Sequence, residues 1–349
     1  MKPSDVVPYL TAISGKAWLS GQQVPEDART PTPTQLLNLS AQPAIVGADI
    51  LCGDSDYYGW DAGVQAILTK HANAGGLIVL CFHPPNLFSG SQDISTAWVP
   101  NPDGPKPDLR QLTSAAGTST AKARYLRAIA RAVAYIKTLP ADAPIVFRPW
   151  HELNGTWFWW GVDKTNPSRS EAGVRALWAD TIARVQSACP NVLSGWATGL
   201  SWYADELYGY PTTAIPDVVG TSMYSDTAQL AHAGDYAKLV STKRPLLLFE
   251  AGPLTDAPGW PAPNLLTGLA AMPLITGWVS WHGNYSLLEM SSSDKVLADA
   301  RVVNRDRLPG NVPQPVGYVY ATSDPDVRLY ASPTAAATVR VPVWAGGAA

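Results

Sequence analysis

Short apolar runs recur along the chain and alternate with segments of helical periodicity. Runs of this length, bounded by Gly, Pro or Asn, predict buried β-strands. The run at 245–249, Pro-Leu-Leu-Leu-Phe, is continuous, which is typical of a parallel strand covered on both faces. On this basis we predict eight strands, at residues 16–21, 44–50, 76–82, 145–147, 192–198, 217–224, 245–249 and 275–281.

Helical stretches separate most of these strands. We expect helices near 34–39 and over 121–139 and 171–188, where apolar residues return every three or four positions. In the second of these helices, the apolar stripe consists of Leu126, Ile129, Val133 and Ile136. Because such stripes pack against a sheet, the pattern indicates an α/β protein in which strands and helices alternate.

The character of the chain changes after residue 310. Three short segments that alternate or run apolar, with a Ser-Asp-Pro-Asp turn between the first two, predict a small β-hairpin appendage. These segments are 316–320, 327–331 and 338–344. The final Gly-Gly-Ala-Ala is typical of a flexible tail. With 349 residues in all, we expect one large domain at 1–310 and an appendage at 311–349.

Composition narrows the choice of partner. The formal net charge is -3, so no basic excess favours nucleic acid or an anionic membrane surface. Only 15% of the residues are charged, while the chain contains 14 Trp and 14 Tyr. A neutral polymer that has both hydroxyl groups and apolar faces, such as a polysaccharide, fits this balance better than a charged partner.

The three cysteines, Cys52, Cys81 and Cys189, form neither a metal-ligand pattern nor a disulfide framework. Cys52 and Cys81 could meet at neighbouring strand ends, but burial in the core is the default expectation for each. Residues 1–16 lack the continuous apolar core of a signal peptide, and no apolar run approaches the ~18 residues of a membrane span. We therefore expect no membrane insertion.

The densest group of chemically active residues follows the predicted strand at 145–147. Arg148, His151, Glu152 and Asn154 lie within seven residues, and three tryptophans and a phenylalanine come directly after them at 157–160. Carbohydrate chemistry needs a carboxyl group with a raised pKa, donors for sugar hydroxyls, and flat rings that cover apolar sugar faces. The alternative is a structural Glu152 paired with Arg148 beneath an aromatic core.

The stretch at 148–161, Arg-Pro-Trp-His-Glu-Leu-Asn-Gly-Thr-Trp-Phe-Trp-Trp-Gly, resembles the acid/base motif of glycoside hydrolase family 26, best known for endo-β-1,4-mannanases. The resemblance covers about residues 14–309 and implies a (β/α)8 TIM barrel and a retaining mechanism. It also implies that Glu152 is the general acid/base. His151 and the other polar and aromatic residues of the motif would contact substrate, namely Arg148, Asn154, Trp157 and Trp160.

A second carboxylate follows the apolar run at 245–249. Glu250 stands at the end of this strand, before Ala-Gly-Pro, and resembles the nucleophile element of the family. Tyr224 matches the tyrosine that lies beside that nucleophile. Ser222, however, occupies a position where the family usually has aspartate, which removes a charge from the site and leaves the sugar specificity open.

Further substrate contacts are expected at other strand ends. His83, in His-Pro-Pro-Asn, resembles a family element in which Leu87 replaces a second proline. Trp281 and His282 follow the eighth predicted strand, although Trp281 could instead fill the barrel. The Pro-rich stretch 89–120 is expected to be a long irregular loop over the site, in which Trp98 either stacks on a sugar or anchors the loop.

We therefore predict a retaining endo-acting glycosidase, acting on mannan or a mannose-containing polysaccharide, in which Glu250 attacks and Glu152 protonates the leaving group. No metal or organic cofactor is required. The alternatives are another β-glycan, as for a phage-encoded depolymerase, or a non-catalytic glycan-binding protein. A monomer is expected unless the tail joins a larger assembly. The substrate argues for an extracellular location, while the absence of a signal peptide favours a phage virion or the cytoplasm.

Overall fold

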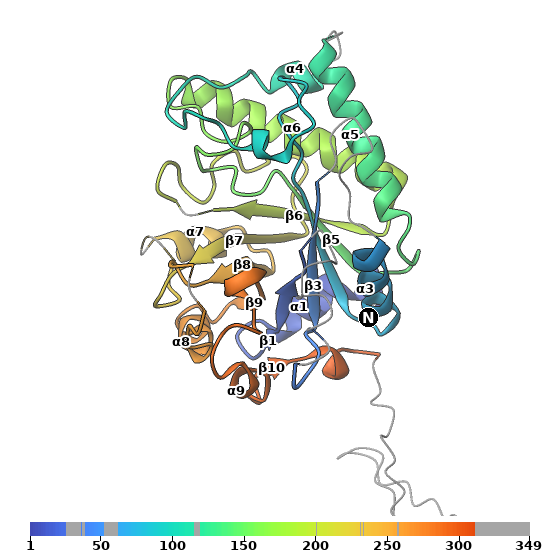
Figure 1. The fold of residues 1–349 in the computed structure, drawn as a ribbon, viewed down its shortest axis with the longest axis vertical. Helices are drawn as coiled ribbons and strands as arrows, with labels where there is room; N and C mark the ends of the chain where they lie inside the picture. Colours follow the sequence, from blue (N-terminus) through green and yellow to red (C-terminus); the bar gives the residue numbers. More distant parts are fainter. Residues whose placement is uncertain are drawn as a thin grey trace, which may run out of the picture. The chain divides into compact units, whose positions relative to one another are not determined.

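The computed structural model describes residues 1–25, 36, 39–51, 62–114, 119–199, 201–230, 232, 234–256 and 258–310. Eight parallel strand positions form a closed barrel, as predicted (Figure 1). The first position is split into β1 (Trp18–Leu19) and β2 (Gly21–Gln23). The others are β3 (Ile45–Ile50), β4 (Leu77–Phe82), β5 (Ile145–Pro149), β6 (Val192–Thr198), β7 (Val218–Tyr224), β8 (Leu246–Gly252) and β9 (Ile275–Ser280).

The barrel closes through β9, which pairs in parallel with β8 on one side and with both β1 and β2 on the other. A short strand, β10 (Val302–Val303), pairs in parallel with the edge of β1 that does not face β9. All eight strands therefore run the same way, so the residues that follow them gather at one end of the barrel, where (β/α)8 enzymes carry their active sites.

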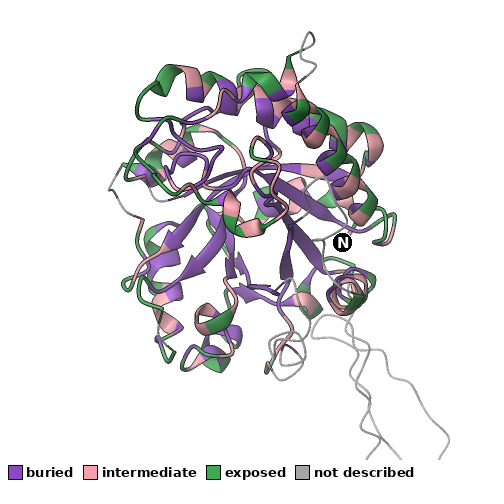
Figure 2. Ribbon diagram, turned by 45° about the horizontal axis from the view of Figure 1, so that its top comes forward, coloured by how far each residue is buried: buried purple, intermediate pink, exposed green. Residues whose placement is uncertain are grey.

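Helices cover the outside of the barrel. Figure 2 shows that the strands are buried, whereas the surrounding helices are exposed on their outer sides. The larger ones are α1 (Pro3–Ile13), α3 (Ala62–Asn73), α5 (Thr120–Ile136), α6 (Pro167–Ala188), α7 (Asp235–Ser241), α8 (Pro263–Ala271) and α9 (Ser293–Leu297). The helix predicted at 171–188 begins earlier because Pro167 occupies its first turn and the Asn166 side chain caps it, accepting a hydrogen bond from Arg169 N.

The strands divide the core in two. In β5, Ile145 and Phe147 belong to the layer between strands and helices, whereas Val146 belongs to the interior of the barrel. Because side chains alternate along a strand, Arg148 also points inward. Apolar side chains thus fill the interior toward the amino ends of the strands, and the interior becomes polar toward their carboxyl ends.

Several expectations need correction or fall outside the description. The stretch 89–120 is not wholly irregular, since it contains a short 3-10 helix, η2 (Ile94–Ala97), and α4 (Arg110–Thr113). Cys81 and Cys189 are free and buried, as expected. Cys52, most of the helix predicted at 34–39, and the appendage predicted at 311–349 lie outside the described residues.

Candidate active site

The motif after β5 adopts a strained turn. Trp150 and Glu152 both have positive φ angles, 58° and 52°, which non-glycine residues rarely adopt. Neighbouring strand ends hold this backbone, because Trp150 N donates to the carbonyl of Phe82 at 3.4 Å and Glu152 N donates to that of Ala197 at 3.0 Å. Strain of this kind costs on the order of 1–3 kcal/mol per residue and collects at functional sites. Here the strained turn fixes the backbone position from which the Glu152 side chain extends.

The Glu152 carboxyl group is enclosed by its neighbours. Trp157 Nε1 donates a hydrogen bond to Glu152 Oε2 at 2.8 Å. On another side Gly199 approaches so closely that a Cβ there would lie 2.9 Å from the Cβ of Glu152. Burial raises the pKa of Glu152 to about 7, and the negative charge of Glu250 acts in the same direction. Near neutral pH, Glu152 is therefore a proton donor.

Glu250 points into the barrel because of a β-bulge. Simple alternation would turn it outward with Leu246 and Leu248, which pack in the outer layer. The pairing of β8 with β7 shifts between Leu248 and Glu250, so that one extra residue, Phe249, stands on β8. A bulge of this kind re-aims the following side chain. The irregular pairing therefore delivers the carboxylate to the interior.

Two side chains hold the Glu250 carboxylate. Arg148 Nη2 lies 2.8 Å from Glu250 Oε1, in an ion pair whose Arg partner is fully buried. Tyr224 Oη donates to the other oxygen, Oε2, at 2.8 Å. The ion pair of Arg148 is thus with Glu250 and not with Glu152, so the alternative of a structural Glu152–Arg148 pair does not describe this site. The carboxyl groups of Glu152 and Glu250 thus interact electrostatically but have different hydrogen-bond and ion-pair partners.

A histidine pair lies beside these carboxyl groups. The ring centroids of His83 and His151 are 4.9 Å apart, and both residues are buried. Burial lowers the pKa of His151 well below its usual value, and its Nδ1 lies 3.2 Å from the sulfur of Cys81. Among the described residues, His83 Nε2 has no hydrogen-bond partner. A buried, unpartnered nitrogen can form a hydrogen bond with a substrate hydroxyl, and the substrate contact of His83 stays a prediction.

Asp49 is a site residue that the sequence reasoning missed. Its Oδ2 lies 3.6 Å from His83 Nδ1, and its Oδ1 accepts a hydrogen bond from Gln23 Nε2 at 2.9 Å. The side chain is 2% exposed. A carboxylate inside the otherwise apolar run of β3 was the available signal, because buried charges are rare unless they are paired.

Trp281 and His282 follow β9 and are both partly exposed, with ring centroids 4.8 Å apart. Trp281 N donates to the carbonyl of Ala251 at 3.2 Å, which ties it to the residue after Glu250. Since its side chain is not fully enclosed, Trp281 does not simply fill the barrel. Tyr285, also partly exposed, packs edge-on against Tyr224 at 5.5 Å.

Asn154 and Trp160, expected to contact substrate, are placed differently by the structure. Neither side chain is exposed. The Asn154 amide donates to the carbonyls of Gly199 and Ala204 and accepts from Gly199 N at 2.7 Å. Trp160 donates to the carbonyl of His151 at 2.9 Å and stacks on Phe158. Both residues support the turn that carries Glu152, and their side chains are closed off from the surface in this structure.

The loop before α5 supports the same turn through a buried lysine. Lys106 Nζ donates to the carbonyls of Thr156, at 2.5 Å, and Phe158, which flank Trp157. Burial lowers the pKa of Lys106 to about 8, against the opposing charge of Asp163. An isolated β-bridge between Trp98 and Phe158 joins the loop to the acid/base turn a second time. Trp98 therefore anchors the loop while 47% of it stays exposed.

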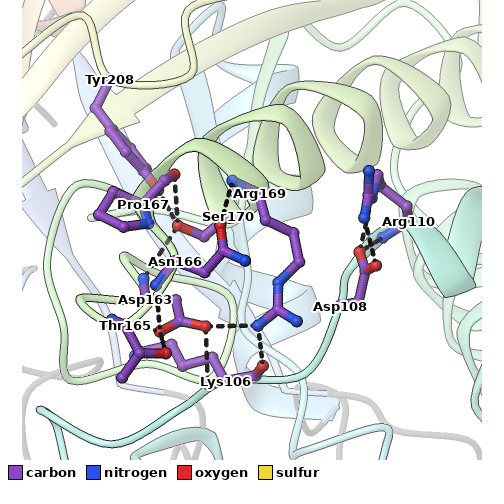
Figure 3. Close-up of polar contacts among 10 residues, drawn as sticks. All are labelled: Lys106, Asp108, Arg110, Asp163, Thr165, Asn166, Pro167, Arg169, Ser170 and Tyr208. Atoms are coloured by element: carbon purple, nitrogen blue, oxygen red, sulfur yellow. Dashed lines mark hydrogen bonds and ion pairs between the residues drawn. The ribbon is translucent and has the colours of Figure 1, made fainter.

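Asp163 joins this loop to the start of α6 (Figure 3). Its carboxylate pairs with Arg169 at 2.7 Å and accepts hydrogen bonds from Lys106 N and Thr165. Although burial acts in the opposite direction, these bonds lower the pKa of Asp163 to about 2. Nothing in the spacing of Lys106 and Asp163 along the sequence predicts this contact.

Another buried carboxyl group, that of Glu206, lies behind the site. Glu206 is 1% exposed, and Thr198 and Thr221, on neighbouring strands, direct their hydroxyl groups toward it. Burial raises the pKa of Glu206 to about 8, so the group is neutral near pH 7. The threonines lie on the outer face of the barrel, away from Glu250. Glu206 therefore has a structural role rather than a catalytic one.

Ser222 lies opposite Glu250 in the pairing of β7 with β8 and is buried. Burial raises the pKa of the neighbouring Glu152, and a hydrogen bond from the Ser222 hydroxyl group acts in the opposite direction. The site thus has no third carboxylate at this position, where the resembling family usually carries one. The described residues also contain no cluster of three or more His, Cys, Asp or Glu side chains that could hold a metal ion.

A (β/α)8 barrel in which one neutral and one ion-paired carboxyl group meet at the carboxyl ends of the strands has the architecture of a barrel glycosidase. The family model described as glycosyl hydrolase family 26 matches residues 1–307, and the chain belongs to that family. No described helix has the length and apolar character needed to span a membrane.

Curated relatives carry mannanase names. The chain is 23% identical over 278 residues to a mannan endo-1,4-beta-mannosidase A and B of Caldalkalibacillus mannanilyticus, covering 77% of this chain and 50% of that protein. It is 25% identical over 239 residues to a Bacillus subtilis mannan endo-1,4-beta-mannosidase, covering 63% of this chain and 61% of the relative. The chain thus spans about half the length of the first of these relatives.

Solved structures share the fold. A Bacillus subtilis mannanase superposes with a TM-score of 0.73 at 17% identity, covering 90% of this chain and 94% of that one. A family 26 structure from Muricauda has a TM-score of 0.68 at 19% identity, covering 87% of this chain and 96% of that one. At these identities the likeness concerns the fold alone.

Proposed function

We propose that this chain is a retaining endo-β-1,4-mannanase that cleaves mannan or a mannose-containing polysaccharide by double displacement. The proposal depends on one observation: two glutamates lie at the same end of the barrel, and their surroundings differ. Glu152 has a pKa raised to about 7, whereas Glu250 is paired with Arg148 and Tyr224. Retaining glycosidases need this division between a proton donor and an ionised nucleophile.

In the first step, a Glu250 oxygen attacks the anomeric carbon. The bond from this carbon to the leaving oxygen breaks, and that oxygen takes the proton of Glu152. Tyr224 and Arg148 hold the two oxygens of Glu250 and so fix its orientation toward the sugar. The products are a glycosyl ester on Glu250 and a released chain with a new hydroxyl group.

In the second step, Glu152 acts as a base. Once Glu250 is esterified its negative charge is gone, and the pKa of Glu152 falls because that charge helped to raise it. Glu152 then takes a proton from water, the resulting oxygen attacks the anomeric carbon, and the ester bond to Glu250 breaks. Two inversions give the original β configuration.

The choice of mannan among β-glycans is supported by family membership and by the names of the curated relatives. His83, whose ring lies 4.9 Å from that of His151, and Trp281 and His282, which follow β9, are the residues we propose to contact the sugar at the cleaved bond. A polymer substrate is too large to enter a cell, so we also propose that the protein acts outside the cell that makes it.

The test is reducing-sugar release from galactomannan, glucomannan, β-1,4-xylan and mixed-linkage glucan. We expect mannans to be shortened, with viscosity falling early as in endo cleavage, and the first product detected by proton NMR to be the β anomer. Cleavage of xylan or mixed-linkage glucan alone would contradict the substrate. Binding of a polymer without shortening would contradict catalysis.

A further inference from the structure

A hollow of about 350 Å³ lies beside the proposed active site, at the carboxyl ends of β6, β7 and β8. These strands are adjacent in the barrel (Figure 1). Its lining begins at Tyr224, whose hydroxyl group bonds Glu250, and extends to Trp202 after β6 and Leu254 after β8. The volume is at the low end of the roughly 300–1,000 Å³ found for small-ligand sites.

Two lining residues of the hollow, Trp202 and Leu254, are apolar and exposed. Trp202 is 55% exposed, more than any other tryptophan that the structure describes, and Leu254 is 56% exposed. Large apolar side chains left open beside a polar hollow mark binding surfaces. A tryptophan ring suits the apolar face of a pyranose, because its flat surface covers C–H groups while the sugar hydroxyls point elsewhere.

Other lining residues of the hollow are polar, and Asp226 among them is held in place. Asp226 Oδ1 accepts a hydrogen bond from Leu254 N at 3.0 Å, and the carbonyl of Asp226 accepts from Trp260 Nε1 at 3.1 Å. Thr227 and Gln229 are exposed on the same segment and offer a hydroxyl and an amide to a ligand. A wall fixed before binding loses little conformational entropy when a sugar arrives.

A line of aromatic residues connects Trp202 with the proposed acid. Trp157, which bonds Glu152, lies edge-on to Tyr203 at 6.2 Å, and Trp202 precedes Tyr203 in the same turn. Tyr203 also contacts Lys164, whose Nζ lies 4.4 Å from the ring centre. Since Glu152 would protonate the leaving oxygen, this is the side on which the released part of the substrate lies.

We infer that the hollow at Trp202 is a binding subsite for a hexopyranose unit of the leaving-group part of a neutral β-glycan. The inference rests on the proposed function and specifies which residues would bind the reducing-end side of that substrate. Among the lining residues that the structure describes, Asp226 is the one ionisable carboxylate, and this low charge fits an uncharged sugar better than an acidic one.

The test compares two substrates of the full chain. β-1,4-Mannohexaose can place sugars on both sides of the cleaved bond, whereas an aryl β-mannobioside has only the aryl ring as its leaving group. In Trp202→Ala we expect the ratio of kcat/KM for the hexaose to kcat/KM for the aryl substrate to fall roughly tenfold, as for loss of one aromatic contact. With the reducing end labelled by ¹⁸O, cleavage should move toward that end.

Two further variants make the test specific. Trp202→Tyr keeps a flat ring and should restore most of the ratio. Leu274→Ala removes another exposed apolar side chain, 39% exposed, before β9 at the opposite end of the barrel, and should give the wild-type ratio and cleavage position. An equal fall on both substrates in Trp202→Ala, or an unchanged cleavage position, would overturn the subsite. If the wild type cleaves neither substrate, the proposed function itself fails.

Discussion

Replacing Trp157 by phenylalanine should move the alkaline limit of activity upward. The change keeps most of the ring but removes the indole N–H that donates to Glu152 Oε2 at 2.8 Å. That hydrogen bond favours the ionised carboxylate, so it lowers a pKa that burial and Glu250 raise to about 7. Without it, Glu152 should keep its proton to higher pH.

The expected size of the shift follows from the strength of this bond. A hydrogen bond to a charged group contributes about 1.5–3 kcal/mol, and one pKa unit corresponds to about 1.36 kcal/mol. The protonated acid can still accept a weaker bond from Trp157, so only the difference between the two states counts. We therefore expect the pKa of Glu152 to rise by about 1 unit, from about 7 to about 8.

The assay is the pH dependence of kcat/KM, which reports ionisations of the free enzyme. Because Glu152 must be protonated to act as the acid, activity is lost as pH rises through its pKa, and the variant should lose it at higher pH. Trp98→Phe is the matched control, since it makes the same change at a partly exposed ring whose contacts with the rings of His83 and Phe158 do not involve Glu152. An alkaline limit in Trp157→Phe that stays in place or moves down would refute the reasoning.

Three further variants test other parts of the site. Glu206 has a pKa raised to about 8 by burial, so the unfolded chain releases its proton at lower pH than the folded chain, and stability falls as pH rises from about 4.5 to 8. Glu206→Gln should therefore melt at higher temperature than the wild type at pH 8 and match it at pH 5; the reverse order would be inconsistent with a neutral Glu206. Lys106→Met removes the ammonium group that holds two carbonyls of the acid/base turn, so urea unfolding should show a loss of about 1–3 kcal/mol and kcat should fall; unaltered kcat would separate this loop from catalysis. Arg148→Met leaves Glu250 buried without its cation and should cost about 3–5 kcal/mol, but much less when combined with Glu250→Gln. Additive losses in that double-mutant cycle would argue against the ion pair.

The sequence predicted the barrel well because each strand is an apolar run bounded by breakers. Whether a given side chain points into or out of the barrel was harder to predict. Glu250 was identified by its place after such a run, yet strict alternation from the interior residue Leu247 would have turned it outward. Its inward position depends on the bulge between Leu248 and Glu250, which is a property of the pairing with β7. No pattern in β8 alone contains that information.

The division of labour inside the acid/base motif was also beyond the sequence. Asn154 and Trp157 looked alike as candidates for substrate contact. The structure uses Asn154 to bond the backbone of Gly199, and uses the ring nitrogen of Trp157 to bond Glu152. Which polar group is occupied depends on the neighbouring strand end, about 45 residues away in sequence. Lys106 was missed for the same reason.

The most direct test of the central claim is azide rescue of Glu152→Ala and Glu250→Ala with a 2,4-dinitrophenyl β-mannoside substrate. Without Glu250, azide takes the place of the nucleophile on that face of the sugar, and the account predicts an α-glycosyl azide. Without Glu152, the reactive leaving group still departs to Glu250, azide then replaces water, and the product should be the β-glycosyl azide. Identical products from both variants, or full activity in either without azide, would contradict the assignment of Glu250 as nucleophile and Glu152 as acid/base.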